Sequence, residues 1–562
     1  MPAPDRAVVL GRIHSVLEFL FAVNPTITFI RITILNPSQI IRKCKGNNQE
    51  AMFIQNFVKS HPLACVLIVA LLLRLIATTW SKGFMAVDDH YSTVGVSYGW
   101  LQYGFIGTDG HLLWGKTPSS EISRFPLYSL SLYVQMRLFL LAGVDSLDTM
   151  MYGIRLVHAL LSLLLVWCSF QIIMLSTKSW RWALFGGLFA AVHFAMPYLS
   201  VRTIIEMVGG HFWLLALWFL YRYRNDNRVR HLFWAGIITG LAWMIRFQIA
   251  FAAIAVPFAL WWITGRIRPA GIYVLGVSIM ILAAGLADYW LLGKFMASNI
   301  NHLFGGVQSI GDPPIYKTSI FIYLTVIAAF FIPPFSIFAL GLCFARKLWR
   351  AHAALILSTV SFVAFHYLTT NRQERFMIPI IGPLLVLIVI AIHHHYESNG
   401  FWFRHRRLAG AIVISALAVN FALLPIFTIR YGHKAEVEPL VQIEKNNKLA
   451  SVLFVDPETK RIFPLGYGGY DGIGRDYVYS WNDFANLEQI RPDIRFYDYY
   501  VLYPSSHAGL PEMIDSLTNR YGPVEQFSYI SPSLVDSWLY ALNPRNVKSP
   551  QAWVYCPRVS VK

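Results

Sequence analysis

Long apolar runs recur along most of this chain of 562 residues, separated by short polar or basic stretches. A helix that crosses a membrane needs about 20 predominantly apolar residues. We place such spans at 62–80, 150–176, 183–199, 204–222, 231–246, 248–264, 270–292, 319–345, 352–370, 377–395 and 409–428. This pattern predicts an all-α polytopic membrane protein with about eleven transmembrane helices.

Three regions do not follow the spanning pattern. Segment 126–143 is shorter and contains Gln135 and Arg137, which favours a membrane-surface or re-entrant helix inside one long external loop, 81–149. Residues 1–61 mix basic and apolar positions, and we expect a cytoplasmic or interfacial extension before a membrane domain at 62–429.

The tail at 430–562 is polar and rich in Tyr, Gly, Pro and Asp. Ser451–Val455 and Tyr499–Tyr503 read as strands, and Pro511–Tyr521 reads as a helix. We therefore predict a small soluble α/β domain on the non-cytoplasmic face.

Composition and charge support a membrane location and set the orientation. Hydrophobic residues make up 56% of the chain and charged residues 14%, against roughly 25% charged in an ordinary soluble domain. The net charge of +17 points to basic cytoplasmic loops rather than to nucleic acid, because the basic residues fall on alternate loops. The basic sets are Lys178/Arg181, Arg222/Arg224/Arg228/Arg230, Arg266/Arg268, Arg346/Lys347/Arg350 and Arg404/Arg406/Arg407. Five scattered cysteines suggest neither a zinc site nor a disulfide framework.

An adjacent acidic pair follows the first span. Asp88 and Asp89 precede a helix-like stretch at Thr93–Tyr103. A carboxylate within hydrogen-bond reach of a hydroxyl can act as a general base. A solvated loop or a helix N-cap would also explain the pair.

Ionisable residues also gather at external helix ends. Arg202 and Glu206 stand four residues apart at the mouth of a span, which permits an ion pair on one helical face but also a polar contact in a cavity. Arg246 and Gln248 lie in an external turn, where a basic residue runs against the charge trend and suggests an anionic ligand.

A late motif, residues 371–376, lies on the same predicted face. Arg372 and Arg375 flank Glu374 and could clamp a phosphate, because a guanidinium offers two parallel hydrogen bonds. Binding of lipid headgroups or snorkelling of the arginines remains the alternative.

In this order, the motifs resemble those of glycosyltransferase family 22 of the GT-C superfamily, whose members include dolichyl-phosphate-mannose-dependent mannosyltransferases and bacterial relatives. The similar stretches are Ala86–Asp89, Ser123–Pro126, Arg202–Glu206, Gly240–Gln248 and Asn371–Phe376. Only the acidic half of the family's His-Pro-Asp-Glu motif is kept, at Asp88-Asp89, and Arg124 matches a further arginine of the first loop.

The resemblance implies an inverting transfer of a hexose, with mannose as the family's sugar, from a polyprenyl-phosphate carrier to a lipid-linked or glycan acceptor. It assigns Asp88 as base, Asp89 as its neighbour, and Arg246, Arg372 and Arg375 as phosphate ligands. No sugar-nucleotide or metal motif is visible, so we expect no cofactor and leave a divalent cation open. The short spans and globular tail favour a bacterial inner membrane over the endoplasmic reticulum, with the active site on the periplasmic or lumenal face.

Three other functions remain open at this stage. A transporter or flippase of lipid-linked glycans would place charges near the bilayer midplane, whereas here they gather at one face. A GT-C transferase of another sugar or acceptor, such as lipid A or protein, fits the same motifs. A third is a binding or assembly role with a degenerate transferase core. The transferase interpretation requires the acidic pair and the late arginines to converge at one water-facing edge.

Overall fold

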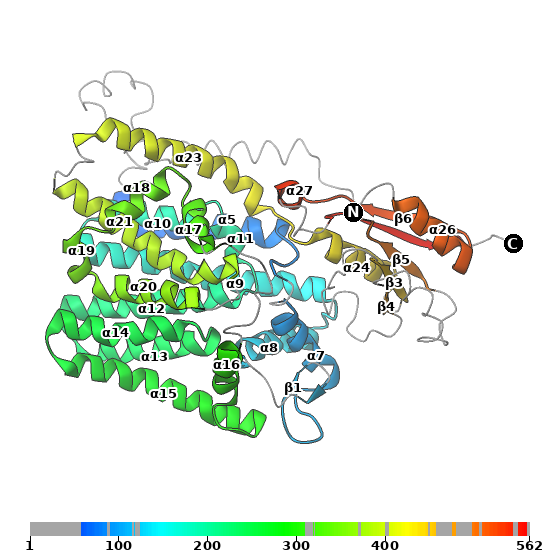
Figure 1. Cartoon of the computed structure of the whole chain (residues 1–562), viewed down its shortest axis with the longest axis horizontal. Helices are drawn as coiled ribbons and strands as arrows, with labels where there is room; N and C mark the ends of the chain where they lie inside the picture. The colour runs from blue at the N-terminus through cyan, green and yellow to red at the C-terminus, as the bar shows by residue number, and fades with distance from the viewer. Residues whose placement is uncertain are drawn as a thin grey trace.

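The protein is a long bundle of helices with a small β-sheet at one end (Figure 1). The computed structural model describes residues 58–86, 90–114, 117–118, 124–308, 319, 321–368, 372–398, 404–447, 450–456, 475–478, 497–504, 509–542 and 549–558. The N-terminal extension predicted at 1–61 therefore lies almost entirely outside the described residues.

The bundle follows the predicted apolar runs closely. Its helices are α5 (Pro62–Trp80), α9 (Leu147–Thr177), α10 (Trp180–Val192), α12 (Ile205–Asp226), α13 (Val229–Ile245), α14 (Ile249–Thr264), α15 (Ile267–Leu292), α20 (Ala353–Leu368), α21 (Ile381–Glu397) and α23 (Arg406–Thr428).

Helix length gives a smaller number of spans than the eleven predicted. Within the described residues, five helices are long and apolar enough to cross a membrane, or six if one bent pair counts as a single span. Helices α10, α13, α14 and α20 are apolar but have 10–17 residues each. The chain is thus a multi-pass membrane protein.

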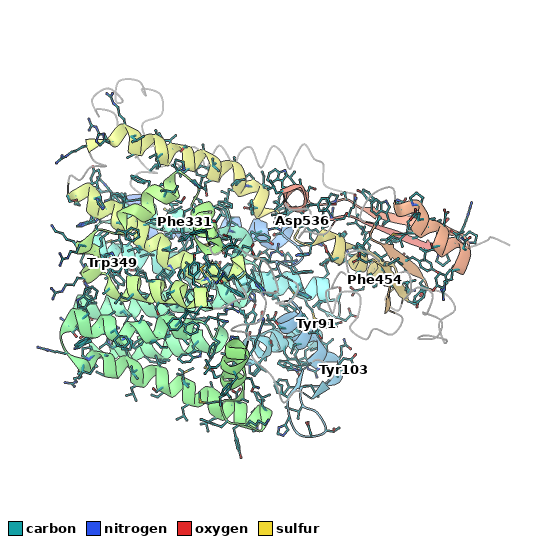
Figure 2. All side chains as sticks on the ribbon, in the orientation of Figure 1. Tyr91, Tyr103, Phe331, Trp349, Phe454 and Asp536 are labelled. Carbon is teal, nitrogen blue, oxygen red and sulfur yellow. The ribbon has the colours of Figure 1, made fainter. Side chains whose placement is uncertain are left out.

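Two predicted spans are broken rather than continuous. Segment 319–345 forms α17 (Ile322–Phe330) and α18 (Phe335–Leu342), which meet at 104°. The break contains Pro333-Pro334, and proline removes a helical N–H donor and clashes with the preceding turn. Figure 2 labels Phe331 at this break.

The helix predicted within 183–199 is also interrupted. Helix α10 ends at Val192, and the short α11 (Met196–Ser200) follows with Pro197 in its first turn. Both predicted spans are therefore helical segments with a break, which apolar composition alone does not reveal because it continues through the break.

Different helices lie at the two ends of the bundle, and a basic set lies at the end away from the sheet. Helix α19 (Arg346–Ala351), which carries one of the basic sets, lies at the end opposite the sheet, with Trp349 marking it in Figure 2. Helices α7 (Val96–Tyr103), α8 (Leu127–Leu141) and α16 (Ala297–Gln308) lie at the end nearer the sheet (Figure 1). The helices predicted at 126–143 and at Thr93–Tyr103 are thus confirmed as helices.

The tail contains a mixed five-stranded sheet in the order β4-β3-β5-β7-β6. Its strands are β3 (Val452–Val455), β4 (Arg475–Val478), β5 (Tyr499–Leu502), β6 (Val524–Ile530) and β7 (Ala552–Pro557), and its helices are α24 (Lys434–Asn446), α26 (Leu510–Tyr521) and α27 (Leu534–Leu542). Strand β3 pairs in parallel with β4 and β5, whereas β7 runs antiparallel to β5 and β6. Both predicted strands and the predicted helix are confirmed.

The sheet shares a hydrophobic core with the bundle. Leu132 of α8 and Ile154 of α9 belong to the same buried cluster as Leu440 of α24, Phe454 of β3 and Val554 of β7. The tail is thus packed onto the bundle through this shared cluster. Burial of its apolar surface stabilises the contact by roughly 25 cal/mol per Å². This continuous core fixes the sheet beside one end of the helix bundle.

Candidate functional site

A buried ion pair joins two of the sequence motifs. The Arg246 guanidinium lies 3.1 Å from a carboxylate oxygen of Glu206, and the two side chains are 5% and 0% exposed. Glu206 stands in the first turn of α12, where the helix dipole favours a negative charge. Arg246 lies between α13 and α14, as the predicted turn requires.

Two adjacent glycines let the surrounding elements approach α12. A Cβ atom on Gly209 would lie 3.0 Å from the Arg246 Cβ, and one on Gly210 would lie 3.0 Å from the backbone of Pro379. Pro379 belongs to the 3₁₀ helix η2 (Glu374–Ile380), which contains the late motif. The Gly209-Gly210 pair therefore allows three separate sequence motifs to meet on one turn of α12.

The late motif places a second arginine near the first. The Phe376 ring centroid lies 5.1 Å from the Arg246 guanidinium carbon and 5.6 Å from that of Arg375. Arg375 also donates from Nε to Gln373 Oε1 at 2.7 Å. Two guanidinium groups thus share one aromatic ring, an arrangement that concentrates positive charge beside a hydrophobic face.

The other charged residues of the late motif have different surroundings. Arg372 is partly buried and donates to the carbonyl oxygen of Tyr367 at 3.3 Å, whereas Glu374 is exposed. Asn371 lies outside the described residues. Of the motif's charged residues, Arg375 is the one that shares the Phe376 ring with Arg246 of the buried pair.

A cavity lies beside the Arg246 turn. It encloses about 330 Å³ of empty space, part of it open to solvent, and Arg124, Arg246 and Gln248 all contribute to its wall. The remaining lining residues are Phe125, Ile205, Trp243, Met244, Ile245, Phe247, Ser298, Asn299 and His302. Arg124 is held by a hydrogen bond to the Ser92 hydroxyl. Three predicted site residues from separate motifs therefore line one cavity.

Arg202 contacts a different set of residues. It lies before α12 begins, so it does not form the predicted i,i+4 pair with Glu206 on one helical face. Its guanidinium donates to the carbonyl oxygens of Lys82, Gly83 and Arg430 and to the Ser81 hydroxyl. Arg202 therefore joins the start of the first external loop to the start of the tail.

The same junction is closed by two glycines and a pair of rings. Gly83 and Gly432 form an isolated bridge, and Gly432 donates its N–H to the carbonyl of Lys82 at 3.1 Å. Phe84 stacks on His433, with ring centroids 4.4 Å apart. We call these contacts, together with those of Arg202, the loop–tail junction.

The acidic pair follows this junction directly. Asp88 and Asp89 lie outside the described residues, so their predicted roles remain predictions. On either side of them, the His90 N–H donates to the Ala86 carbonyl at 3.1 Å. The described flanks of the pair are thus close to one another.

Sequence reasoning missed one wall of the cavity. Ser298, Asn299 and His302 come from α16, which lies between the predicted spans 270–292 and 319–345, where no helix was predicted. Polar residues at 298, 299, 301 and 302 alternate with apolar positions at 300, 303 and 304, a helical pattern that could have revealed α16. In the described parts of the chain, no group of three or more His, Cys, Asp or Glu residues is placed to hold a metal ion.

The buried pair leads to a test of stability. Replacing Glu206 with alanine is expected to lower the free energy of unfolding by about 3–5 kcal/mol, because it leaves a desolvated guanidinium without its carboxylate. Thermal unfolding of purified protein in detergent measures this effect. In the double variant E206A/R246M, much of the stability should return.

The matched control lies on the other end of the same helix. Arg222 and Asp226 form a partly exposed i,i+4 pair at 3.9 Å, so Arg222→Ala, which leaves the other contacts of Asp226 in place, should cost at most about 1 kcal/mol. Equal losses for Arg222→Ala and Glu206→Ala would contradict the assignment of Glu206 as a buried partner.

Comparison with known proteins identifies the fold. Residues 135–289 match the family model described as dolichyl-phosphate-mannose-protein mannosyltransferase. No curated protein sequence matches the chain. The crystal structure of ArnT from Cupriavidus metallidurans bound to undecaprenyl phosphate is similar, with a TM-score of 0.54 and 14% identity over 88% of this chain and 98% of that one.

Two further structures show weaker similarity. The oligosaccharyltransferase AglB from Archaeoglobus fulgidus, in complex with an inhibitory peptide and a dolichol-phosphate, has a TM-score of 0.45 and 11% identity over 85% of this chain and 74% of its own. The arabinofuranosyltransferase AftD from Mycobacteria has a TM-score of 0.46 and 14% identity over 89% of this chain and 40% of its own. The fold of this chain is therefore that of ArnT, the structure among these with a TM-score above 0.5.

Proposed function

We propose that this GT-C-fold protein is a membrane glycosyltransferase that takes a sugar from a polyprenyl-phosphate carrier and transfers it, with inversion, to a lipid-linked or glycan acceptor on the periplasmic or lumenal face. The proposed sugar is a hexose, with mannose as the first candidate. The observation that carries the proposal is the meeting of Arg246 and Arg375 at Phe376, beside a cavity at the sheet end of the bundle.

The arginines would act on the departing phosphate. As the bond between the anomeric carbon and the phosphate oxygen breaks, negative charge grows on the phosphate. Guanidinium groups already held in place stabilise that charge without reorganising. Glu206 offsets part of the Arg246 charge and fixes its direction, and Arg372 is a further candidate ligand.

The acidic pair would act on the acceptor. Asp88 would remove the proton from the attacking hydroxyl, and Asp89 would orient the acceptor or adjust the protonation of Asp88, because adjacent carboxylates raise one another's pKa. The new glycosidic bond forms as the phosphate leaves from the opposite side of the sugar ring. That geometry inverts the anomeric centre.

Arg202 would position the first loop rather than bind substrate. Four hydrogen-bond acceptors at the loop–tail junction surround its guanidinium. Arg124 and Gln248 stand on the cavity wall and would contact the sugar or the acceptor.

Purified protein in liposomes tests this proposal. The donor is undecaprenyl-phosphate-mannose with a labelled sugar, and lipid-linked oligosaccharide, lipid A and a serine-rich peptide are offered separately as acceptors. We expect label on one acceptor together with release of undecaprenyl phosphate, both detected by mass spectrometry. Movement of the intact donor between leaflets with no release would instead support a flippase, and the proposal would fail.

A further inference from the structure

The cavity beside Arg246 has a wall whose chemistry is neutral and polar. We infer that this wall, built by Trp243, Gln248, Asn299 and His302, is the sugar-binding subsite of the proposed donor site and that it accepts an uncharged sugar ring. The inference rests on the proposed function. It goes further by stating which part of the cavity binds the sugar and which class of sugar that part accepts.

The wall is held together across two elements. Trp243 donates from its indole nitrogen to Asn299 Oδ1 at 3.1 Å, and the Gln248 amide nitrogen lies 3.0 Å from His302 Nε2. Trp243 and Gln248 belong to the turn region between α13 and α14, whereas Asn299 and His302 belong to α16. Each pair therefore links the bundle to α16, and the two pairs stand one helical turn apart along α16.

Helix α16 is itself fixed at its start. The buried Asp288 carboxylate accepts hydrogen bonds from the Ser298 N–H at 2.9 Å and from the Ser298 hydroxyl at 2.7 Å. A carboxylate at a helix N-terminus accepts hydrogen bonds from N–H groups that have no partner within the helix, and its negative charge interacts favourably with the helix dipole. This anchor holds Asn299 and His302 in a defined direction, which a recognition site requires.

The groups on the wall match the needs of sugar hydroxyls. A hydroxyl both donates and accepts, and amide side chains offer both functions. The Gln248 side-chain oxygen is buried and has no protein hydrogen-bond partner among the described residues. Trp243 and Phe247 add ring faces, whose negative quadrupole suits the C–H groups of a sugar ring.

The charges on the wall exclude one class of sugar. The charged groups among the described lining residues are the guanidiniums of Arg124 and Arg246, and no carboxylate is among them. An ammonium group on the sugar would lose its hydration, would find no carboxylate to pair with among the described lining residues, and would meet the Arg124 guanidinium, which together cost several kcal/mol. A neutral sugar avoids this cost. The Arg246 end of the cavity, which lies toward Phe376 and Arg375, is the end for the phosphate.

A binding experiment separates the sugar subsite from the phosphate site. The affinity of the full-length protein in nanodiscs is measured for undecaprenyl phosphate, for undecaprenyl-phosphate-mannose and for undecaprenyl-phosphate-glucosamine. We expect mannose to tighten binding relative to the phosphate alone and glucosamine to weaken it, with about a 100-fold difference between the two sugars. In Asn299→Ala and in His302→Ala, the gain from mannose should fall by about tenfold each, while the affinity for undecaprenyl phosphate stays unchanged.

The control and the contrary outcomes are distinct. Asn301→Ala changes the same residue type on α16 at a position outside the lining, and it should leave all three affinities as they are. If undecaprenyl phosphate binds but mannose adds nothing, or if glucosamine binds as tightly as mannose, the sugar subsite is wrong while the proposed function stands. If none of the three carriers binds, the proposed function itself fails.

Discussion

Replacing Asp88 with asparagine is expected to lower sugar transfer by about 10²–10⁴-fold, to the background of the assay, while the protein remains folded and inserted in the membrane. The amide keeps the size of the side chain but cannot accept the proton of the acceptor hydroxyl. Without a base, the hydroxyl is a poor nucleophile toward the anomeric carbon. Release of undecaprenyl phosphate in proteoliposomes measures the loss.

Asp109 supplies the matched control for this change. It lies in the same external loop, is exposed, and accepts a hydrogen bond from the backbone N–H of His111 at 3.1 Å. Asp109→Asn should therefore keep nearly full activity. Binding of undecaprenyl phosphate should be unchanged in both variants, since the proposed phosphate ligands are arginines. Full transfer by the Asp88→Asn protein would reject Asp88 as the base.

A single methyl group at the loop–tail junction is expected to have a second large effect. Gly83 has φ +75°, and a Cβ placed on it would lie 1.8 Å from the carbonyl oxygen of Gly432. In Gly83→Ala, the loop and the tail must separate or the backbone must change conformation. The combined cost is at least about 2 kcal/mol. Thermal unfolding should show this loss.

The same variant should also lose activity. Asp88 follows Gly83 by five residues, and a displacement of about 1 Å in a catalytic group can cost about 10²-fold in rate. Gly110→Ala isolates the effect of crowding, because Gly110 also has a positive φ, +78°, but has no atom within 4 Å of its Cβ position. Equal losses in the two variants would mean that the close approach to Gly432 is unimportant.

The helices of this fold could be predicted from sequence more fully than their breaks. Ends such as Pro62 and Trp80 follow from where the apolar run starts and stops, because lipid-facing and core-facing positions are both apolar. The same property hides the breaks at Pro333-Pro334 and after Val192, where hydrophobicity continues while the backbone turns. Proline was visible at both places and is the signal that reveals them.

The candidate site was predictable in its residues but not in its partners. Arg202 and Glu206 have helical spacing, yet the contacts of Arg202 reach Ser81 and Arg430, which are 121 and 228 residues away in sequence. Such long-range contacts depend on how the bundle closes, and a local pattern does not contain that information. Arg246 differs, because a basic residue in an external turn already signalled a partner or an anion.

The loop–tail junction also bears on the order of events during synthesis. The first external loop emerges from the ribosome early, whereas Arg430 and Gly432 follow only after the bundle helices have been made. The first loop, which begins near Gly83, is therefore synthesised long before Arg430 and Gly432 are available to form the loop–tail junction with it. The hydrogen bonds from Arg202 to Arg430 and from Gly432 to Lys82 can therefore form only in the last part of synthesis.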